Sequence, residues 1–206
     1  MVLNTMRKGE SMAEFVAFTP GVEVNGQTVL SVVEGSTIKM SALNYLAKNG
    51  IADPKPGAWY PQQAWLNAFR SIVNEVGHVI LFQIGRKIPE SADWPPQVND
   101  IHGALASIDI AYHMNHRLSG QLMFDPATSA MREGIGHYDY QRINDLTATM
   151  ICNNPYPCDF DTGIIVAVAN KFKPDGFRVI VTHVHPDRCR KKGDDICSYT
   201  VNWHPE

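Results

Sequence analysis

NDIHGALASIDIAYHMNHRL, residues 99–118, is followed directly by SGQLMFDPAT, residues 119–128. The first stretch carries apolar residues at the spacing of one helix face, at Ile101, Leu105, Ile108 and Tyr112. This periodicity predicts an amphipathic helix that ends at Ser119-Gly120. The second stretch opens a series of short segments with strand character and turn residues between them. The chain is therefore predicted to place its helices first and its strands later.

Three segments upstream of this helix also have the apolar spacing of helices. They cover residues 37–48, the stretch that begins at Pro61, and residues 78–87. Proline suits the first position of a helix, which supports the second of these predictions. Before them, residues 22–30 alternate around Asn25-Gly26, a dipeptide that favours a tight turn between two strands, so we expect a hairpin there.

Most segments after residue 120 predict strands of an antiparallel sheet, with one buried helix over residues 161–172. The predicted strands are residues 121–124, 131–140, 147–152, 179–184 and 198–203. These expectations give an α+β fold class in which several N-terminal helices pack on a C-terminal antiparallel sheet. We expect residues 1–20 to form a mobile N-terminal arm and residues 21–206 to form a single ligand-binding domain.

The composition favours one compact domain and excludes several functions. A hydrophobic content of 44% over 206 residues is enough for a single buried core. A formal charge of −3, from 18 basic and 21 acidic residues, provides no field that would attract nucleic acid, so we expect no nucleic-acid partner. No apolar run approaches the roughly 20 residues needed to cross a bilayer, and the first residues lack a secretory signal. We therefore expect no membrane span and a cytoplasmic location.

Four cysteines are the chemically informative residues of the last third of the chain: Cys152, Cys158, Cys189 and Cys197. Thiolates from two short segments can converge on zinc, which prefers four sulfur or nitrogen ligands. Zinc is therefore a candidate cofactor at these residues, although the spacings Cys152-x5-Cys158 and Cys189-x7-Cys197 differ from the tight C-x2-C knuckle. Two alternatives stay open, because the cysteines could be small buried apolar residues or could pair as disulfides.

The end of the chain, CRKKGDDICSYTVNW at residues 189–203, has a distinctive order of residues. A cysteine, a Gly-Asp turn and a second cysteine lead into a final strand with an aromatic residue. This order resembles the closing signature of the 4-vinyl-reductase sensor domains, which share a superfamily with haem-nitric-oxide-binding domains and TRAPP components. The segment NPYPCDFD, residues 154–161, agrees with the resemblance, which covers roughly the last third of the chain.

The resemblance implies a sensor that holds a small, often apolar molecule in a pocket between helices and sheet, commonly as a homodimer. It matches Cys189 and Cys197 residue by residue, with Cys158 or Cys152 as companions. Aromatic residues of the helical half can line such a pocket, although core packing is the commoner role for each of them singly. The predicted ligand-binding residues are Trp59, Trp65, Phe69, Phe82, Tyr112, His113 and His116.

A second hypothesis rests on the polar border of the helix at residues 99–118. His102, Asp109, His113 and His116 fall within about 60° of one another there, and imidazoles with a carboxylate can hold a transition metal. If the strands that carry His137, His183 and His185 face this helix, the alternative function is a small haem or non-haem metalloenzyme with a histidine-lined site. The simpler interpretation is a solvated helix edge.

Two further observations bear on cofactors and catalysis. The covalent haem attachment motif C-x-x-C-H is absent, and haem is the less favoured cofactor. No standard catalytic signature is present either, so the sequence leaves enzyme activity open. A scaffold that only pairs with other proteins is a third hypothesis, and it predicts neither a pocket nor a metal site.

Overall fold

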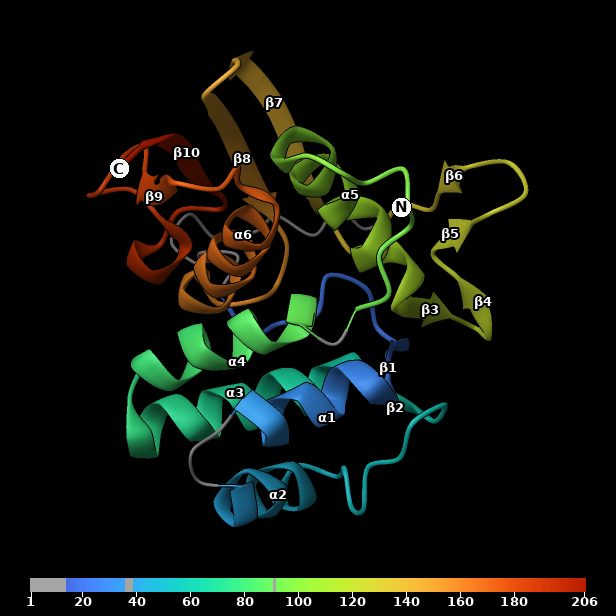
Figure 1. Cartoon of the computed structure of the whole chain (residues 1–206). Helices are drawn as coiled ribbons and strands as arrows, with labels where there is room; N and C mark the ends of the chain where they lie inside the picture. The colour runs from blue at the N-terminus through green and yellow to red at the C-terminus, as the bar shows by residue number, and fades with distance from the viewer. Residues whose placement is uncertain (1–13, 36–38, 91) are drawn as a thin grey trace, which may run out of the picture.

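The computed structural model describes residues 14–35, 39–90 and 92–206, and it confirms the predicted α+β fold class (Figure 1). The helices are α1 (Gly26–Gly35), α2 (Lys39–Lys48), α3 (Gln62–Val76), α4 (Val79–Glu90), α5 (Ile101–Met114) and α6 (Cys158–Phe172), with a short 3-10 helix η1 (Arg190–Lys192). The strands are β1 (Val22–Asn25), β2 (Trp59–Pro61), β3 (His116–Leu118), β4 (Gln121–Leu122), β5 (Phe124–Asp125), β6 (Ala130–Met131), β7 (His137–Asn144), β8 (Thr147–Asn153), β9 (Phe177–His183) and β10 (Cys197–Pro205).

The main sheet has the strand order β7-β8-β10-β9, with every neighbouring pair antiparallel. Alternate residues of β10 are buried, because successive side chains of a strand point to opposite faces. The register places Cys197 of β10 opposite Cys152 of β8, and Cys152 opposite Tyr138 of β7. The inner face of this sheet, covered by α5 and α6, carries residues of both candidate sites described below.

A second, smaller sheet has the order β2-β1-β3-β4, and it corrects two expectations. The prediction of a hairpin at Asn25-Gly26 is wrong, because β1 ends at Asn25 and α1 starts at Gly26. The Asn25 side chain accepts a hydrogen bond from the Gln27 amide at 2.7 Å, as an N-terminal helix cap does. The helix predicted to reach Leu118 ends at Met114, since His116–Leu118 pairs with β1 instead.

Helices α4 and α6 cross in close contact, and this contact joins the helical half to the sheet half (Figure 1). Two glycines permit it. A Cβ atom on Gly85 would lie 2.1 Å from the Phe160 carbonyl oxygen, and one on Gly163 would lie 2.3 Å from the Phe82 carbonyl oxygen. The two backbones can therefore approach only because neither position carries a side chain.

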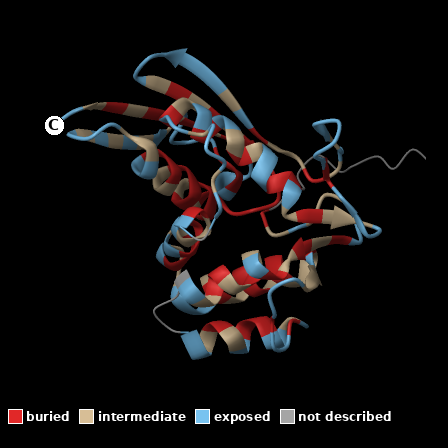
Figure 2. Ribbon diagram, turned by 45° about the vertical axis from the view of Figure 1, so that its right-hand side comes forward, coloured by how far each residue is buried: buried red, intermediate tan, exposed pale blue. Residues whose placement is uncertain are grey.

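The core runs through both halves, and Figure 2 shows exposure increasing toward the far end of the β7–β8 hairpin. Of the predicted arm, residues 1–13 lie outside the described residues. The end that is described contacts the body: the Phe15 amide donates to the Pro155 carbonyl, and the Glu14 carboxylate accepts from the Cys158 amide. None of the helices in the described part of the chain has the length and apolarity needed to span a membrane.

Candidate functional site

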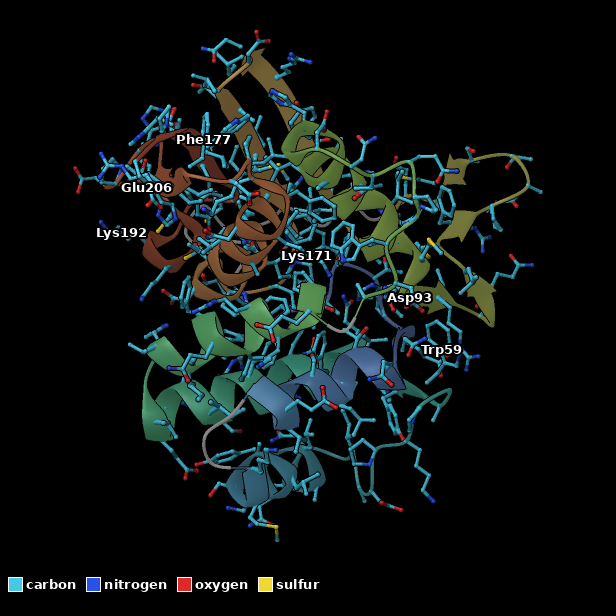
Figure 3. The ribbon with its side chains drawn as sticks, viewed as in Figure 1. Trp59, Asp93, Lys171, Phe177, Lys192 and Glu206 are labelled. Carbon is cyan, nitrogen blue, oxygen red and sulfur yellow. The ribbon has the colours of Figure 1, made fainter. Side chains whose placement is uncertain are left out.

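A cavity of about 370 Å³ lies between α1, α3, α5 and α6. Its walls are mainly apolar, and aromatic rings form much of them. Asp93, which lies in the loop after α4 and also lines the cavity, is labelled in Figure 3 between α5 and the layer of α1 and α3. The ring-bearing residues of the wall that matter below are Trp65, Tyr112, His116, Tyr138, Tyr156 and Phe160. An apolar cavity with few polar groups is typical of small-molecule sites.

His116 and Tyr156 form a buried polar pair in this apolar wall. The Nδ1 of His116 lies 2.7 Å from the Tyr112 carbonyl oxygen, which only accepts, so Nδ1 carries the proton. Its Nε2 therefore accepts from the Tyr156 hydroxyl at 2.7 Å, while Gln62 donates to the same hydroxyl oxygen at 3.0 Å. Burial lowers the pKa of His116 to about 4, so the imidazole is neutral at pH 7.

Trp65 adds an unused hydrogen-bond donor to the same wall. The side chain is 1% exposed, and its Nε1 is buried without a partner among the residues that the structure describes. A buried donor without a partner costs about 1–3 kcal/mol, so native proteins rarely leave one. A ligand that accepts a hydrogen bond would remove this cost.

A second group of residues lies at the start of α6, where sulfur atoms converge. One ligand atom each from Cys158, His183, Cys189 and Cys197 lies within 4.8 Å of the other three. Cys158 begins α6, His183 ends β9, Cys189 precedes η1, and Cys197 begins β10. In Figure 3 this region, beside the labelled Lys192, lies on the opposite side of the molecule from Trp59.

The electrostatics of this cluster favour one thiolate. The adjacent Cys158 side chain lowers the pKa of Cys197, and His183 and Arg190 act in the same direction. The backbone amide of Arg190 also donates to the Cys197 sulfur at 3.3 Å. The Nε2 of His183 is buried and has no hydrogen-bond partner among the described residues. Three cysteine sulfurs and an imidazole with one unpaired nitrogen are a suitable donor set for a tetrahedral metal ion.

A buried network connects this cluster with the cavity. The Tyr138 hydroxyl donates to Oδ1 of Asp161 at 2.5 Å, and Oδ2 of Asp161 forms an ion pair with Arg190. Arg190 also donates to the carbonyl and the side chain of Asn154. Desolvation raises the pKa of Asp161 to about 6, an effect that Arg190 and Tyr138 oppose.

The structure brings together three of the seven residues predicted to bind a ligand: Trp65, Tyr112 and His116 line the cavity. The other four lie elsewhere. Trp59 stacks under the guanidinium of Arg117, and Phe69 is a fully buried core residue. The Phe82 backbone packs on Gly163, and His113 contacts Asp109 on the same helix. Sequence patterns mark these residues as apolar or aromatic but do not state which side of a helix faces a void.

Three of the four cysteines predicted as metal ligands, Cys158, Cys189 and Cys197, lie together in the structure, and metal binding by them stays a prediction. Cys152 lies outside the group, and His183 takes the fourth place. Burial raises the pKa of the Cys152 thiol well above its usual range, so that side chain stays neutral. The sequence signal for His183 was its position in His183-x-His185. Tyr156, Asp161 and Arg190 lie in residues 154–161 and 189–203, the segments that carry the family resemblance, whereas no sequence signal distinguished Tyr138.

The four polar residues predicted on one border of α5 separate into three environments. His102 contacts the Tyr140 hydroxyl at 2.6 Å, and His116 faces the cavity. Asp109 and His113 lie together with His137 in a third place. His185, which was grouped with them, is exposed.

No family model and no curated protein sequence matches this chain. Its structure, however, resembles solved structures. One is an H-NOX protein from S. oneidensis in the Fe(II)NO ligation state, at 14% identity and a TM-score of 0.60, covering 87% of this chain and 99% of that one. Another is an oxygen-binding H-NOX domain related to soluble guanylate cyclases, at 16% identity and a TM-score of 0.59, covering 88% and 96%. The chain has the H-NOX fold. This agrees with the predicted α+β fold, whereas the likeness to 4-vinyl-reductase domains and the shared superfamily stay predictions.

The ranking of haem as the less favoured cofactor is wrong. Another solved structure with this fold probes the function of heme distortion in the H-NOX family. An imidazole is one of the side chains that can hold haem iron, and His116 is the one histidine among the described residues that line the cavity. Its neutral ring fits that role if the Tyr156 hydroxyl gives up its hydrogen bond.

Proposed function

We propose that this chain is a sensor-like domain that binds a small, mainly apolar molecule in the cavity between α1, α3, α5 and α6. The observation that carries the proposal is an apolar cavity of about 370 Å³ whose wall holds the unpartnered Nε1 donor of Trp65. Such a site would bury most of a small ligand and orient it by one or two polar contacts.

The polar groups of the wall favour a ligand with a hydroxyl group. Tyr112 donates its hydroxyl proton to the Ile135 carbonyl, Tyr138 donates to Asp161, and Tyr156 donates to His116. The capacity that remains on these oxygens is for accepting hydrogen bonds. A ligand hydroxyl can donate to one of them and accept from Trp65, which an aliphatic or aromatic hydrocarbon cannot do.

Isothermal titration calorimetry with phenol and toluene tests this proposal. We expect phenol to bind about tenfold more tightly than toluene, the effect of one added hydrogen bond. Ala111→Trp, which fills the cavity from α5, should abolish binding of both. Ala106→Trp is the matched control, because Ala106 is exposed on the same helix and outside the cavity. Equal binding by the two variants would refute the cavity as the site.

We also propose that Cys158, His183, Cys189 and Cys197 bind a divalent metal ion such as Zn²⁺. The support is the convergence of their ligand atoms within 4.8 Å and the buried, unpaired Nε2 of His183. An ion there would fix η1 and the start of β10 to α6, a structural role. Metal analysis of purified Cys189→Ser protein should show the loss of one equivalent relative to the unaltered chain. Cys152→Ser, outside the cluster, should keep it.

Haem is a second candidate occupant of the cavity, favoured by the H-NOX fold and by His116. A bound haem supplies an iron atom that can bind a gas molecule or transfer an electron. The absorption spectrum of the purified protein distinguishes the two occupants. A Soret band in the unaltered chain that disappears in His116→Ala would identify haem as the occupant of the cavity. If no Soret band forms after haem is added, the smaller apolar molecule remains the proposed ligand. A homodimer and a cytoplasmic location stay predictions.

A further inference from the structure

A third cluster of ligating side chains lies apart from the cavity and from the cysteines. It joins α5, which carries Asp109 and His113 four residues apart, to the first residue of β7, His137. One ligand atom from each of these residues lies within 4.8 Å of the other two. None of the three lines the cavity or belongs to the cysteine cluster.

The Asp109 carboxylate lies at the centre of this cluster. Its Oδ2 is 2.9 Å from Nδ1 of His137, and its Oδ1 is 3.4 Å from Nδ1 of His113. The Tyr138 amide donates to the same Oδ1 at 2.9 Å, which fixes the carboxylate relative to β7. The rings of His113 and His137 lie 4.9 Å apart between centroids. Two imidazoles and one carboxylate are thus held by rigid elements rather than by a loop.

His113 provides the observation that points to a ligand. Its side chain is 0% exposed, and Nε2 has no hydrogen-bond partner among the residues described. Nδ1 lies 2.8 Å from the Asp109 carbonyl oxygen, an acceptor, so Nδ1 carries the proton and Nε2 keeps its lone pair. A backbone carbonyl that fixes one ring nitrogen while the other stays unprotonated is how proteins hold a metal-binding histidine.

The cluster also has a route to solvent and an outer carboxylate. The side chains of His137 and Asp109 are 25% and 14% exposed, so an ion can enter without unfolding the domain. Oε2 of Glu133 lies 3.3 Å from Nε2 of His137, and that glutamate is 85% exposed. Glu133 can orient the His137 ring or contribute a further oxygen ligand.

We propose that Asp109, His113 and His137 form a second site, for a divalent transition-metal ion. Two imidazoles with one carboxylate leave coordination positions open, and this donor set suits Zn²⁺, Fe²⁺ and Co²⁺ better than Mg²⁺ or Ca²⁺. The ion would bridge α5 and β7 and would leave part of its coordination sphere to water or to an exchangeable ligand. The site depends neither on the cavity nor on the cysteine cluster.

The test is a Zn²⁺ titration of the full-length chain by calorimetry, with bound ions counted by native mass spectrometry. We expect His137→Ala to bind one Zn²⁺ ion fewer than the unaltered chain. If both ions still bind, we expect the more weakly bound one to have an affinity at least tenfold lower than in the unaltered chain. His204→Ala is the matched control, because His204 on β10 belongs to neither cluster. Asp109→Asn should act as His137→Ala does. If Asp109→Asn loses tertiary structure by circular dichroism, the comparison rests on His137→Ala, because the His137 side chain is the more exposed of the two.

Two results would overturn the proposal. One is equal stoichiometry and equal affinity for the unaltered chain and His137→Ala. The other is the loss of all ion binding in Cys189→Ser, since every bound ion would then belong to the cysteines. The expected result for Cys189→Ser is instead one remaining ion, whose binding His137→Ala removes in the double variant.

Discussion

The guanidinium of Arg190 and the carboxylate of Asp161 form an ion pair in which the two side chains are 1% and 0% exposed. Arg190 follows Cys189 directly, and Asp161 lies in the first turn of α6, which begins at Cys158. The pair therefore ties the cysteine-bearing turn to the helix that borders the cavity. Two buried charges are tolerated there because each has hydrogen-bond partners besides the other.

We predict that Asp161→Asn lowers the free energy of unfolding by about 3–5 kcal/mol, because it leaves the Arg190 charge buried without its counter-ion. Urea denaturation measures the change. Asp145→Asn is the control, since Asp145 pairs with Arg142 on the surface and such pairs contribute about 0–1 kcal/mol. A similar small loss in both variants would contradict a special role for the buried pair.

The stability of the domain should depend on the protonation of His116. Its pKa falls from an ordinary value of 6.5 to about 4 on folding, so the unfolded chain binds more protons between these values. Stability therefore rises with pH across this window and is lost as pH falls below 6.5, by up to about 3 kcal/mol. Denaturant titrations at several pH values between 4 and 7 measure it.

His116→Gln should flatten this part of the pH profile, because glutamine does not titrate. His137 contributes with the opposite sign. The pKa of His137 is raised despite the desolvation that opposes it, by Asp109 and Glu133, so its contribution is present at low pH and lost as pH rises through that pKa. An unchanged slope in His116→Gln would show that other groups cause the acid loss.

Gly85→Ala should destabilise the domain by about 1–3 kcal/mol, because its Cβ would overlap the Phe160 carbonyl at the crossing of α4 and α6. Alanine ordinarily stabilises an exposed helix interior by up to about 1 kcal/mol relative to glycine. Gly103→Ala on α5 provides that comparison, since the nearest atom to its Cβ is a side-chain oxygen of the Asp100 helix cap at 3.2 Å rather than a backbone atom. Thermal denaturation should show a larger loss of stability in Gly85→Ala than in Gly103→Ala.

Removal of metal should unfold the cysteine-bearing turn before the rest of the domain. We expect a chelator to lower the melting temperature of the unaltered chain by more than that of Cys189→Ser, because a structural metal at the cysteines contributes to folding directly. The accessibility of Cys197 to a thiol reagent should increase on chelation. Equal melting with and without chelator in the unaltered chain would contradict a structural metal there.

Local patterns were enough to predict most elements and the fold class. The apolar spacing of α5 and the alternation in β8 and β10 are imposed by the side of each element that faces the core, and sequence periodicity records this directly. The prediction of a turn at Asn25-Gly26 was wrong because the same two residues also suit the start of a helix. Which state forms depends on β2 and β3, which are distant in sequence and pair with β1.

The candidate sites were less predictable, since they depend on register and on empty space. Cys152 and Cys197 are direct neighbours across two strands, yet the structure places His183 of β9 in the cluster instead. That choice follows from how β9 aligns with β10, which no local pattern reports. The cavity was anticipated in kind, but Tyr138 and Tyr156 resemble ordinary core residues in the sequence.

Tyr138 is held at both ends, by Asp109 at its backbone amide and by Asp161 at its hydroxyl, while its ring forms part of the cavity wall. A guest that displaces this ring must disturb at least one of two carboxylates, one beside a pair of imidazoles and the other beside the sulfur-rich turn. If such a guest changes the affinity of either of those two places for an ion, thermodynamic reciprocity requires that the ion changes the affinity for the guest by the same factor. One tyrosine thus contacts three separate places in the molecule and can couple binding at one of them to binding at the others.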